Sequence, residues 1–369
     1  MKKIVITTDQ IHLHGGIEKV MATKVNYWVN LPNVEVIILT TEQNNLPPCY
    51  SLDNRVRLLD LCINYNRQKS YLSIENIVKA IKHFIRQRKV LKEVKPHTII
   101  SPSYSFDHFW LPFIKNNALL IKECHSSGHN SLKQRASASF INRIKLAFND
   151  WIAKKYNYII VLNKDEKQYI TSENSVVIPN PIDLSDLIAD VRAKQVIAAG
   201  RLSPIKRFDK LIEAWVLVHK AMPDWQLHIY GQNYFNTKQR LQQQITDLGL
   251  DNVIIIKDSV SNIPKVMTEY SIYAMTSESE CFPMVLLEAL SVGLPIVSFD
   301  CPNGPRNIIK NQQDGILVPS GDMQALADVL LKLMGNIENR SVMSKQAKKN
   351  IERFSTSTVM KQWQRLLGI

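Results

Sequence analysis

Two carboxylates, Glu280 and Glu288, lie in one segment that could bind a polar ligand, Ser277–Pro295. An apolar strand pattern ends near Met275, Glu280 follows in a short loop, and Pro283 suits a first helical turn because it needs no N–H donor. The positive end of that helix would face a ligand at the loop. Glu288 then lies on an otherwise apolar helix, where a charge is costly unless it is paired or binds a ligand. A hydroxyl-rich or cationic ligand would satisfy it, and so would a neighbouring arginine.

A second candidate site follows the expected strand Val196–Ala199. Gly200 and Arg201 come directly after this strand, and Lys206 follows in the same loop. The carboxyl ends of parallel strands are where α/β sheets bind ligands, and Arg and Lys can neutralise a diphosphate. The segment is therefore either an anion-binding loop or a solvated basic turn.

A third candidate is the glycine pair Gly15 and Gly16, which separates an expected strand from an expected helix. Glycine lets the backbone approach a ligand closely, and a helix N-terminus presents free N–H groups, so this loop could face a phosphate. A tight turn without a ligand is the alternative. The chain contains neither GxGxxG nor GxxxxGK[ST], which argues against the dinucleotide-binding and Walker-type classes.

Short β-branched runs alternate with longer amphipathic stretches in both halves of the chain, which indicates parallel sheets with crossover helices. We expect helices over Phe208–Met222 and Lys238–Leu248. The expected strands are Lys3–Thr7, Val34–Thr40, Thr98–Ser101, Leu119–Cys124, Tyr158–Leu162, Val196–Ala199, Gln226–Tyr230, Val253–Lys257, Ile272–Met275, Pro295–Phe299 and Gly315–Val318.

The length of 369 residues suits two α/β domains better than one core. Pro179 and Pro181 precede a polar stretch that reaches Lys194, and the alternating pattern restarts after it. We therefore place the boundary near residue 190, which gives Rossmann-like domains over 1–190 and 191–369 that face a cleft. A last helix is expected over 357–367, and we expect it to pack back across the first domain.

The composition gives a net charge of +13, which predicts attraction to a polyanion: nucleic acid, anionic lipid or a phosphorylated substrate. No apolar run reaches the roughly 18 residues of a membrane span, and Asp9 interrupts the first apolar run before an export signal could form. The five cysteines contain no CxxC pair, which argues against a disulfide framework and a zinc site. We expect a cytoplasmic protein, soluble or peripheral on a membrane.

Glu280 and Glu288 form an E-x7-E signature with the flanking residues Phe282–Val297, and this segment resembles the family 4 retaining glycosyltransferases of GT-B fold, of the bacterial surface-polysaccharide type. The similarity continues through Asp300–Pro305 and Gly315–Asp322. Further landmarks of the family occur in the same order along the chain: Gly15-Gly16, Val177–Pro181, and Gly200–Leu202 with Lys206. The resemblance therefore covers most of the chain and is most specific in the second domain.

The resemblance implies a role for each matching residue. In similar enzymes, the residue matching Glu288 holds the nucleotide ribose through its hydroxyls, and the one matching Glu280 contacts the donor sugar. Arg201 and Lys206 match cations that hold the diphosphate and stabilise it as the leaving group. His125, after an expected strand, matches a histidine that contacts the donor sugar.

Backbone groups complete the implied donor site. The groups that would face the phosphates and the sugar belong to Gly15, Gly16, Phe282, Pro283, Met284 and Val285. Two departures from the family pattern stand out: Cys281 occupies a usual glycine position, and residues 42–96 match no motif. Acceptor specificity is expected in that unmatched region.

The implied reaction moves a sugar from a nucleotide sugar, with UDP as the expected nucleotide, to an acceptor hydroxyl with retention of configuration. The family favours a front-face mechanism in which the departing phosphate helps to deprotonate the acceptor. Glu280 is then an orienting group and not a nucleophile. No cofactor or metal is expected, because Arg201 and Lys206 can replace a bound cation and no convincing Asp-x-Asp clamp occurs.

Two basic amphipathic stretches, Lys79–Lys95 and Phe140–Tyr156, could lie on an anionic membrane surface. They could equally be solvated helix faces that also pack on the sheet. On the membrane interpretation the acceptor is lipid-linked, which suits assembly of lipopolysaccharide, capsule or another surface glycan.

Two other functions compete with glycosyl transfer. A GT-B epimerase of nucleotide sugars keeps the fold without an acceptor, and product analysis separates the two. A nucleic-acid-binding protein would explain the charge, but no RNP-like strand or recognition-helix motif occurs, so we expect no nucleic-acid partner.

Overall fold

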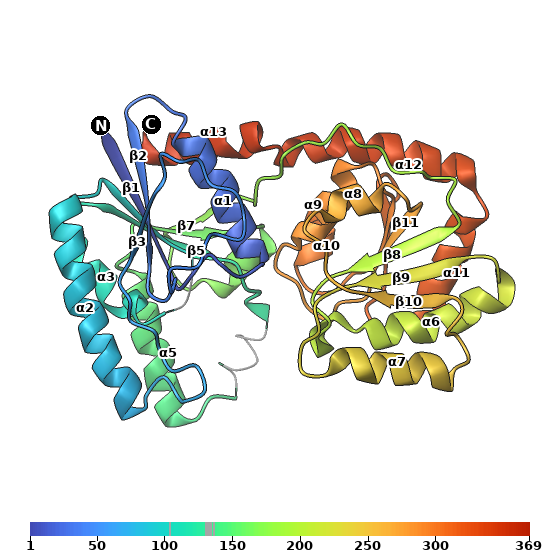
Figure 1. The fold of residues 1–369 in the computed structure, drawn as a ribbon, viewed down its shortest axis with the longest axis horizontal. Helices are drawn as coiled ribbons and strands as arrows, with labels where there is room; N and C mark the ends of the chain where they lie inside the picture. Colours follow the sequence, from blue (N-terminus) through green and yellow to red (C-terminus); the bar gives the residue numbers. More distant parts are fainter. Residues whose placement is uncertain (103–104, 130–134, 136) are drawn as a thin grey trace. The chain divides into compact units, whose positions relative to one another are not determined.

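The structure is a computed structural model that describes residues 1–102, 105–129, 135 and 137–369 (Figure 1). Its internal contacts divide the chain into two compact units. The first unit consists of Met1–Pro181 together with Val359–Ile369, and the second of Ile182–Thr358. The sequence placed this boundary near residue 190. The expected return of the last helix to the first domain is confirmed.

A seven-stranded parallel sheet forms the centre of the first unit, in the order β3-β2-β1-β4-β5-β6-β7. Side chains alternate between its faces, so Ile4 and Ile6 enter one core while Val5 enters the other. The strands are β1 Lys2–Thr8, β2 Val34–Thr40, β3 Arg57–Asp60, β4 Thr98–Ser101, β5 Leu119–Cys124, β6 Tyr158–Val161 and β7 Ser175–Val177. Strands β3 and β7 were not among the strands expected from the sequence.

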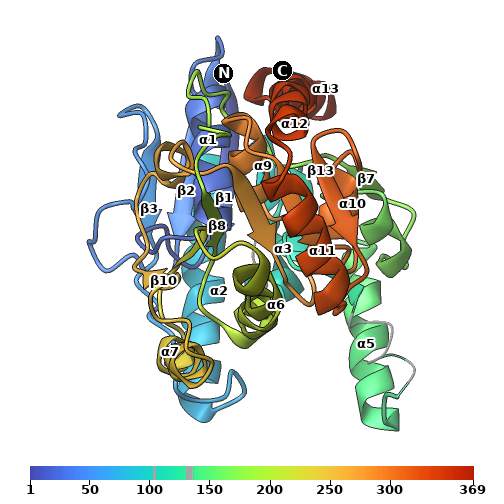
Figure 2. The same cartoon turned by 90° about the vertical axis from the view of Figure 1, so that its right-hand side faces the viewer.

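Helices cover both faces of this sheet (Figures 1 and 2). Helices α1 and α13 share one core, where the rings of Trp28 and Trp363 meet edge to face at 5.6 Å. Helices α2, α3 and α5 share the other core with the opposite face of the sheet. The helices are α1 Gly16–Trp28, α2 Ile74–Val94, α3 Asp107–Ile114, α5 Phe140–Ala153 and α13 Thr356–Leu367, and a 3-10 turn, η1, spans Asp165–Tyr169.

A six-stranded parallel sheet forms the second unit, in the order β10-β9-β8-β11-β12-β13. The chain adds β9 and β10 on one side of β8 and then crosses to add β11, β12 and β13 on the other. The carboxyl ends of β8 and β11 therefore lie at a topological switch point, where open α/β sheets bind ligands. The strands are β8 Gln195–Ala199, β9 Gln226–Tyr230, β10 Ile254–Lys257, β11 Ile272–Met275, β12 Ile296–Phe299 and β13 Gly315–Val318.

The helices of the second unit bury continuous apolar faces. Helix α6 places Leu211, Trp215 and Val218 in the main core of this unit, each without exposed surface. The helices are α6 Phe208–Ala221, α7 Thr237–Asp247, α8 Ile263–Met267, α9 Met284–Ser291, α10 Gly304–Ile308, α11 Met323–Met334 and α12 Ile337–Asn350, with 3-10 turns η2 at Pro204–Lys206 and η3 at Ile351–Phe354. Within the part of the chain that the structure describes, no helix has both the length and the apolar character needed to cross a membrane.

Candidate active site

The loops after β8 and β11 bring two of the predicted residues into direct contact. Lys206 ends the turn η2, and its Nζ lies 2.5 Å from Oε1 of Glu280, in the loop after β11. Ser277 donates a hydrogen bond of 2.7 Å to the same carboxylate oxygen. The backbone N–H of Glu278 donates to the Ile205 carbonyl at 2.8 Å and fixes one loop against the other. The structure therefore joins a cation and a carboxylate at the switch point of the second sheet.

The surroundings of Glu280 show why this loop needs its particular residues. A Cβ on Gly304 would lie 2.6 Å from the Cβ of Glu280 and 2.9 Å from the Cδ of Pro283, so a side chain at this position would displace the loop. Cys301 is fully buried, and burial together with the charge of Glu280 raises the pKa of its thiol to about 12. The thiol of Cys301 is therefore protonated at neutral pH and does not add charge to the site.

Arg201, directly after β8, presents an exposed cation. Its guanidinium carbon lies 5.1 Å from the centre of the Tyr234 ring, which is a cation–π contact. Among the residues that the structure describes, no carboxylate forms an ion pair with Arg201. The charge of Arg201 is thus available to an anionic ligand, whereas Lys206 already contacts Glu280.

Helix α9 begins one residue later than the sequence predicted. Met284 is its first residue, and Pro283 is the N-cap in an extended conformation. Phe282, before the helix, is buried and packs edge to face on Phe354 at 5.4 Å. Phe282 and Pro283 therefore lead into this helix, and Met284 and Val285 belong to its first turn, where backbone N–H groups are free of helical partners.

Glu288 lies in the second turn of α9 and is 6% exposed. Burial and the charges of Glu280 and Glu288 raise the pKa of Tyr273, whose hydroxyl donates to the Ala199 carbonyl at 2.9 Å. The negative charges of both glutamates therefore act on the hydroxyl of Tyr273, which lies at the end of β8. The two carboxylates of the E-x7-E signature belong to one neighbourhood of the second unit.

In the first unit, the paired glycines open α1 as predicted. Gly16 is the first residue of the helix and is exposed, and Gly15 is its N-cap. A Cβ on Gly15 would lie 2.2 Å from an oxygen of Glu18, so this acidic side chain folds over the turn. The carboxylate of Glu18 also accepts a hydrogen bond of 3.0 Å from Gln10. Glu18 places a negative charge at the helix end where a phosphate was expected.

His125 follows β5, as expected, and belongs to a buried chain of ionisable groups. Its Nε2 lies 3.0 Å from Glu123, whose other oxygen lies 2.5 Å from Nζ of Lys24 on α1. The ammonium of Lys24 lies 4.6 Å from the centre of the Trp363 ring on α13. The side chains of His125, Glu123 and Lys24 are only 5%, 2% and 3% exposed, so the imidazole is held rigidly.

The electrostatics of this chain follow from its burial. Burial lowers the pKa of Lys24, although the carboxylate of Glu123 acts in the opposite direction. Burial would raise the pKa of Glu123, but Lys24 and His125 outweigh it and lower that pKa to about 2. The sequence did not reveal this pair. The signal available was a charged residue on the buried side of α1 and another in the apolar strand β5.

The predicted site residues are distributed over both units. Gly15, Gly16 and His125 belong to the first unit, and Arg201 belongs to the second with Lys206, Glu280, Glu288 and the start of α9. Over the residues with described positions, no group of three or more His, Cys, Asp or Glu side chains is arranged to hold a metal ion.

Comparison with known proteins identifies glycosyltransferases among the relatives of this chain. Residues 183–350 match the family described as Glycosyl transferases group 1. The whole chain is 25% identical to an uncharacterized glycosyltransferase of Haemophilus influenzae and 25% identical to the amylovoran biosynthesis glycosyltransferase AmsD of Erwinia amylovora, and it covers 100% of each.

The fold has solved counterparts as well. A crystal structure of S. aureus TarM in complex with fondaparinux, alpha-GlcNAc-glycerol and UDP superposes with a TM-score of 0.78 at 16% identity, over 100% of both chains. At this identity the similarity establishes the fold. The chain therefore has the GT-B fold, and its residues 183–350 are similar to the group 1 glycosyl transferases.

Proposed function

We propose that this protein is a retaining glycosyltransferase that moves a sugar from a nucleotide-sugar donor, with UDP as the expected nucleotide, to an acceptor hydroxyl. The observation that carries the proposal is the Lys206–Glu280 contact, in a glycosyltransferase group 1 domain, at the switch point of its sheet. A sugar diphosphate needs both kinds of group, because its phosphates require cations and its hydroxyls require acceptors.

Donor binding would rearrange the Lys206–Glu280 pair. A diphosphate carries more charge than one carboxylate, so Lys206 would turn toward it while Glu280 accepts a hydrogen bond from a sugar hydroxyl. Arg201 would supply the second cation, since its charge is exposed at the end of β8. Preorganised cations that stabilise a leaving group lower the barrier in the role that a metal has elsewhere. We accordingly propose a metal-independent reaction.

Glu288 would hold the ribose. A carboxylate accepts from two hydroxyls at once, and its burial strengthens both bonds. The backbone N–H groups at the start of α9 would face the phosphates, with the positive end of the helix oriented toward them.

In the first unit, His125 would contact the donor sugar. Its ring orientation is set by Glu123 and, through Glu123, by Lys24. Retention would follow a front-face path: the departing phosphate removes the proton of the acceptor hydroxyl as this oxygen bonds to the anomeric carbon. Glu280 then orients the sugar and forms no covalent bond with it.

The acceptor would belong to a surface glycan. AmsD is described as an amylovoran biosynthesis glycosyltransferase, and TarM was crystallised with alpha-GlcNAc-glycerol, fondaparinux and UDP. The net charge of +13 suits work at the anionic cytoplasmic face of a membrane, which is where a lipid-linked acceptor would lie.

The test is a panel of nucleotide sugars with measurement of nucleoside diphosphate release, using a Glu288→Ala variant as the matched control. We expect release with one donor and retained anomeric configuration in the product. An epimerised sugar nucleotide without any acceptor product would instead identify the isomerase. Inactivation of the wild type by a chelator, with recovery on addition of Mg²⁺, would contradict the metal-independent mechanism.

A further inference from the structure

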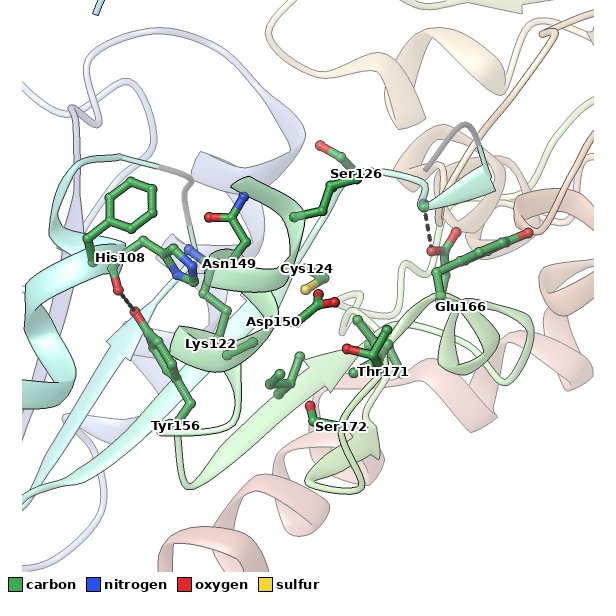
Figure 3. A pocket seen from close by; sticks show the side chains of 18 of the residues that line it. His108, Lys122, Cys124, Ser126, Asn149, Asp150, Tyr156, Glu166, Thr171 and Ser172 are labelled. Atoms are coloured by element: carbon green, nitrogen blue, oxygen red, sulfur yellow. Dashed lines mark hydrogen bonds between the residues drawn. The ribbon is translucent and has the colours of Figure 1, made fainter. Parts of the chain in front are cut away.

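The first unit contains a cavity of about 490 Å³ between β5, β6 and the helices α3 and α5 (Figure 3). This volume lies in the range of small-molecule sites, which are roughly 300–1,000 Å³ and mostly apolar. Figure 3 shows Lys122 and Cys124 of β5 and Asn149 and Asp150 of α5 around the hollow. Its apolar lining includes Phe106, Phe109, Leu146, Ala153, Val161 and Ile170.

Two cations, Lys122 and Arg135, and two carboxylates, Asp150 and Glu166, line the cavity, so its lining carries no net charge when all four are ionised. Asp150 forms a two-bond ion pair with Arg135, with both distances 2.8 Å. Lys122 is 2% exposed: burial lowers its pKa, and the charge of Asp107 acts in the opposite direction. A ligand that fills this space therefore needs no net charge inside it, which favours a hydrocarbon chain over a sugar or a nucleotide.

Helix α5 is unusual because apolar side chains extend from its outward side as well. Of its residues, all of which the structure describes, Ile152 alone is buried. Phe148 and Trp151 are both 48% exposed. Phe148 stacks on Phe109 of α3 at 5.8 Å, and Trp151 lies 6.0 Å from Phe113. We call these four side chains the aromatic face.

The aromatic face contacts one cation and belongs to a basic stretch of sequence. The Nζ of Lys155 lies 4.3 Å from the centre of the Trp151 ring. Arg143, Lys145 and Lys154 belong to the same stretch, while Asp150 is its only acidic residue and is paired with Arg135. Exposed aromatic rings within a basic rim complement an anionic bilayer, in which rings enter the interface and cations remain at the phosphates.

Phe109 connects the two features. It lines the cavity, and its ring also stacks on Phe148 of the aromatic face. The cavity therefore lies directly behind the surface that suits a bilayer. A chain that leaves the bilayer at this place would remain in apolar surroundings while it enters the protein.

We propose that this cavity takes the hydrocarbon chain of a membrane lipid with a phosphate headgroup, drawn from an anionic bilayer that the aromatic face binds. The headgroup remains outside, near Lys154 and Lys155. The role of the lipid rests on the proposed function, because such a lipid would carry the sugar acceptor. The test of lipid binding does not depend on sugar transfer.

The test titrates the full chain with octyl, decyl and dodecyl phosphate by calorimetry, below their micelle concentrations, with inorganic phosphate as the headgroup alone. Burial of each methylene should tighten binding about fourfold. Leu146→Trp fills the cavity and should weaken dodecyl phosphate binding at least about tenfold. Ala153→Leu is a smaller filling change that keeps the test available if the tryptophan variant does not fold.

The matched control changes the surface and leaves the cavity intact. Phe113→Ala with Trp151→Ala should abolish co-sedimentation with phosphatidylglycerol vesicles and leave dodecyl phosphate binding unchanged. Equal affinity for all chain lengths, or unchanged affinity in both filled variants, would overturn the cavity proposal. Binding of UDP to the wild type is measured separately. If the wild type does not bind UDP, the proposed function is contradicted, while the alkyl phosphate results still test the cavity.

Discussion

Helix α6 of the second unit and helix α2 of the first unit use their side chains in opposite ways. In the second unit, α6 buries a continuous apolar face that includes Leu211 and Trp215. In the first unit, α2 buries His83 and Gln87, each 1% exposed, while Ile81 and Ile85 are 58% and 59% exposed. Gln87 accepts a hydrogen bond from the Trp110 indole at 2.6 Å, and Nδ1 of His83 lies 3.0 Å from the hydroxyl of Tyr65.

The difference shows what an apolar pattern means in each unit. In the second unit the apolar side chains identify the core, and this is the unit that the family pattern covers. In the first unit a part of the apolar pattern identifies the outer surface of α2 and α5 instead. If this contrast is functional, changes in the first unit should affect stability and surface binding, and changes in the second unit should affect chemistry.

The largest effect is expected from the buried pair of the first unit. Glu123→Gln leaves the ammonium of Lys24 buried without its anion, and breaking such a pair costs about 3–5 kcal/mol. Thermal or urea unfolding measures the loss. Lys24→Met combined with Glu123→Gln removes both charges and should recover most of the stability. A fully stable single variant would show that the pair does not hold α1 against β5.

The same pair predicts a pH dependence. The pKa of Glu123 falls from the reference value of 4.5 to about 2 on folding, so its ionised form is favoured in the folded state. This contribution to stability is complete above about pH 4.5 and is lost as the pH falls toward 2. Urea unfolding of the wild type and of Glu123→Gln over this range should converge in free energy toward the acid end, and parallel curves would contradict the assignment.

In the second unit, Lys206→Ala should lower turnover by at least about a hundredfold, because it removes one preorganised charge from the leaving group. Arg201→Ala should have a similar effect for the same reason. The matched control is Lys194→Ala, which breaks the exposed ion pair with Asp224 in the same unit. Steady-state rates with the identified donor decide between them, and equal rates for Lys206→Ala and the control would remove Lys206 from the site.

Glu288→Ala should weaken donor binding by at least about tenfold, since hydrogen bonds to a charged group contribute about 1.5–3 kcal/mol. Calorimetric titration with the nucleotide sugar measures it. Glu288→Gln keeps the shape and an acceptor, so its loss should be smaller. Unchanged affinity in a folded Glu288→Ala protein would show that the ribose binds elsewhere.

The smallest effects are expected on the outer surface of the first unit. Lys89→Ala and Lys92→Ala on α2 should each weaken binding to phosphatidylglycerol vesicles about fivefold, because one cation near an anionic surface contributes about 1 kcal/mol. Binding should also fall as the salt concentration rises. Lys332→Ala on α11 is the control and should change nothing. Equal binding to anionic and neutral vesicles at low salt would exclude the membrane hypothesis.

The sequence predicted most strands of both units and the two-sheet fold, because buried strands and crossover helices leave a local pattern. It also placed Arg201 and Lys206 after β8 and Glu280 after β11, since motif order and strand ends are local information. The contact between Lys206 and Glu280 depends only on β8 and β11 being neighbouring strands, which the fold class already implies.

The remainder depends on residues that are distant in sequence. Lys24 and Glu123 meet only because α1 packs across β5, and no spacing rule connects them. On α2, Ile81 and Leu91 share a helical pattern, yet Ile81 is exposed and Leu91 is fully buried. The way in which α2 packs on the sheet decides which of these two side chains is buried, and that packing is a tertiary property. The cavity behind α5 likewise has no signature in the sequence.

The position of α13 has a consequence for how the protein is made. Val359, Met360 and Trp363 complete a core whose other members come from strands and a helix near the start of the chain. The ribosome therefore synthesises the whole second unit before the first unit can finish its packing. During that interval, Trp28 lacks the ring of Trp363, and the second unit is free to fold on its own. In the order of synthesis, the unit that begins first is the one that is completed last.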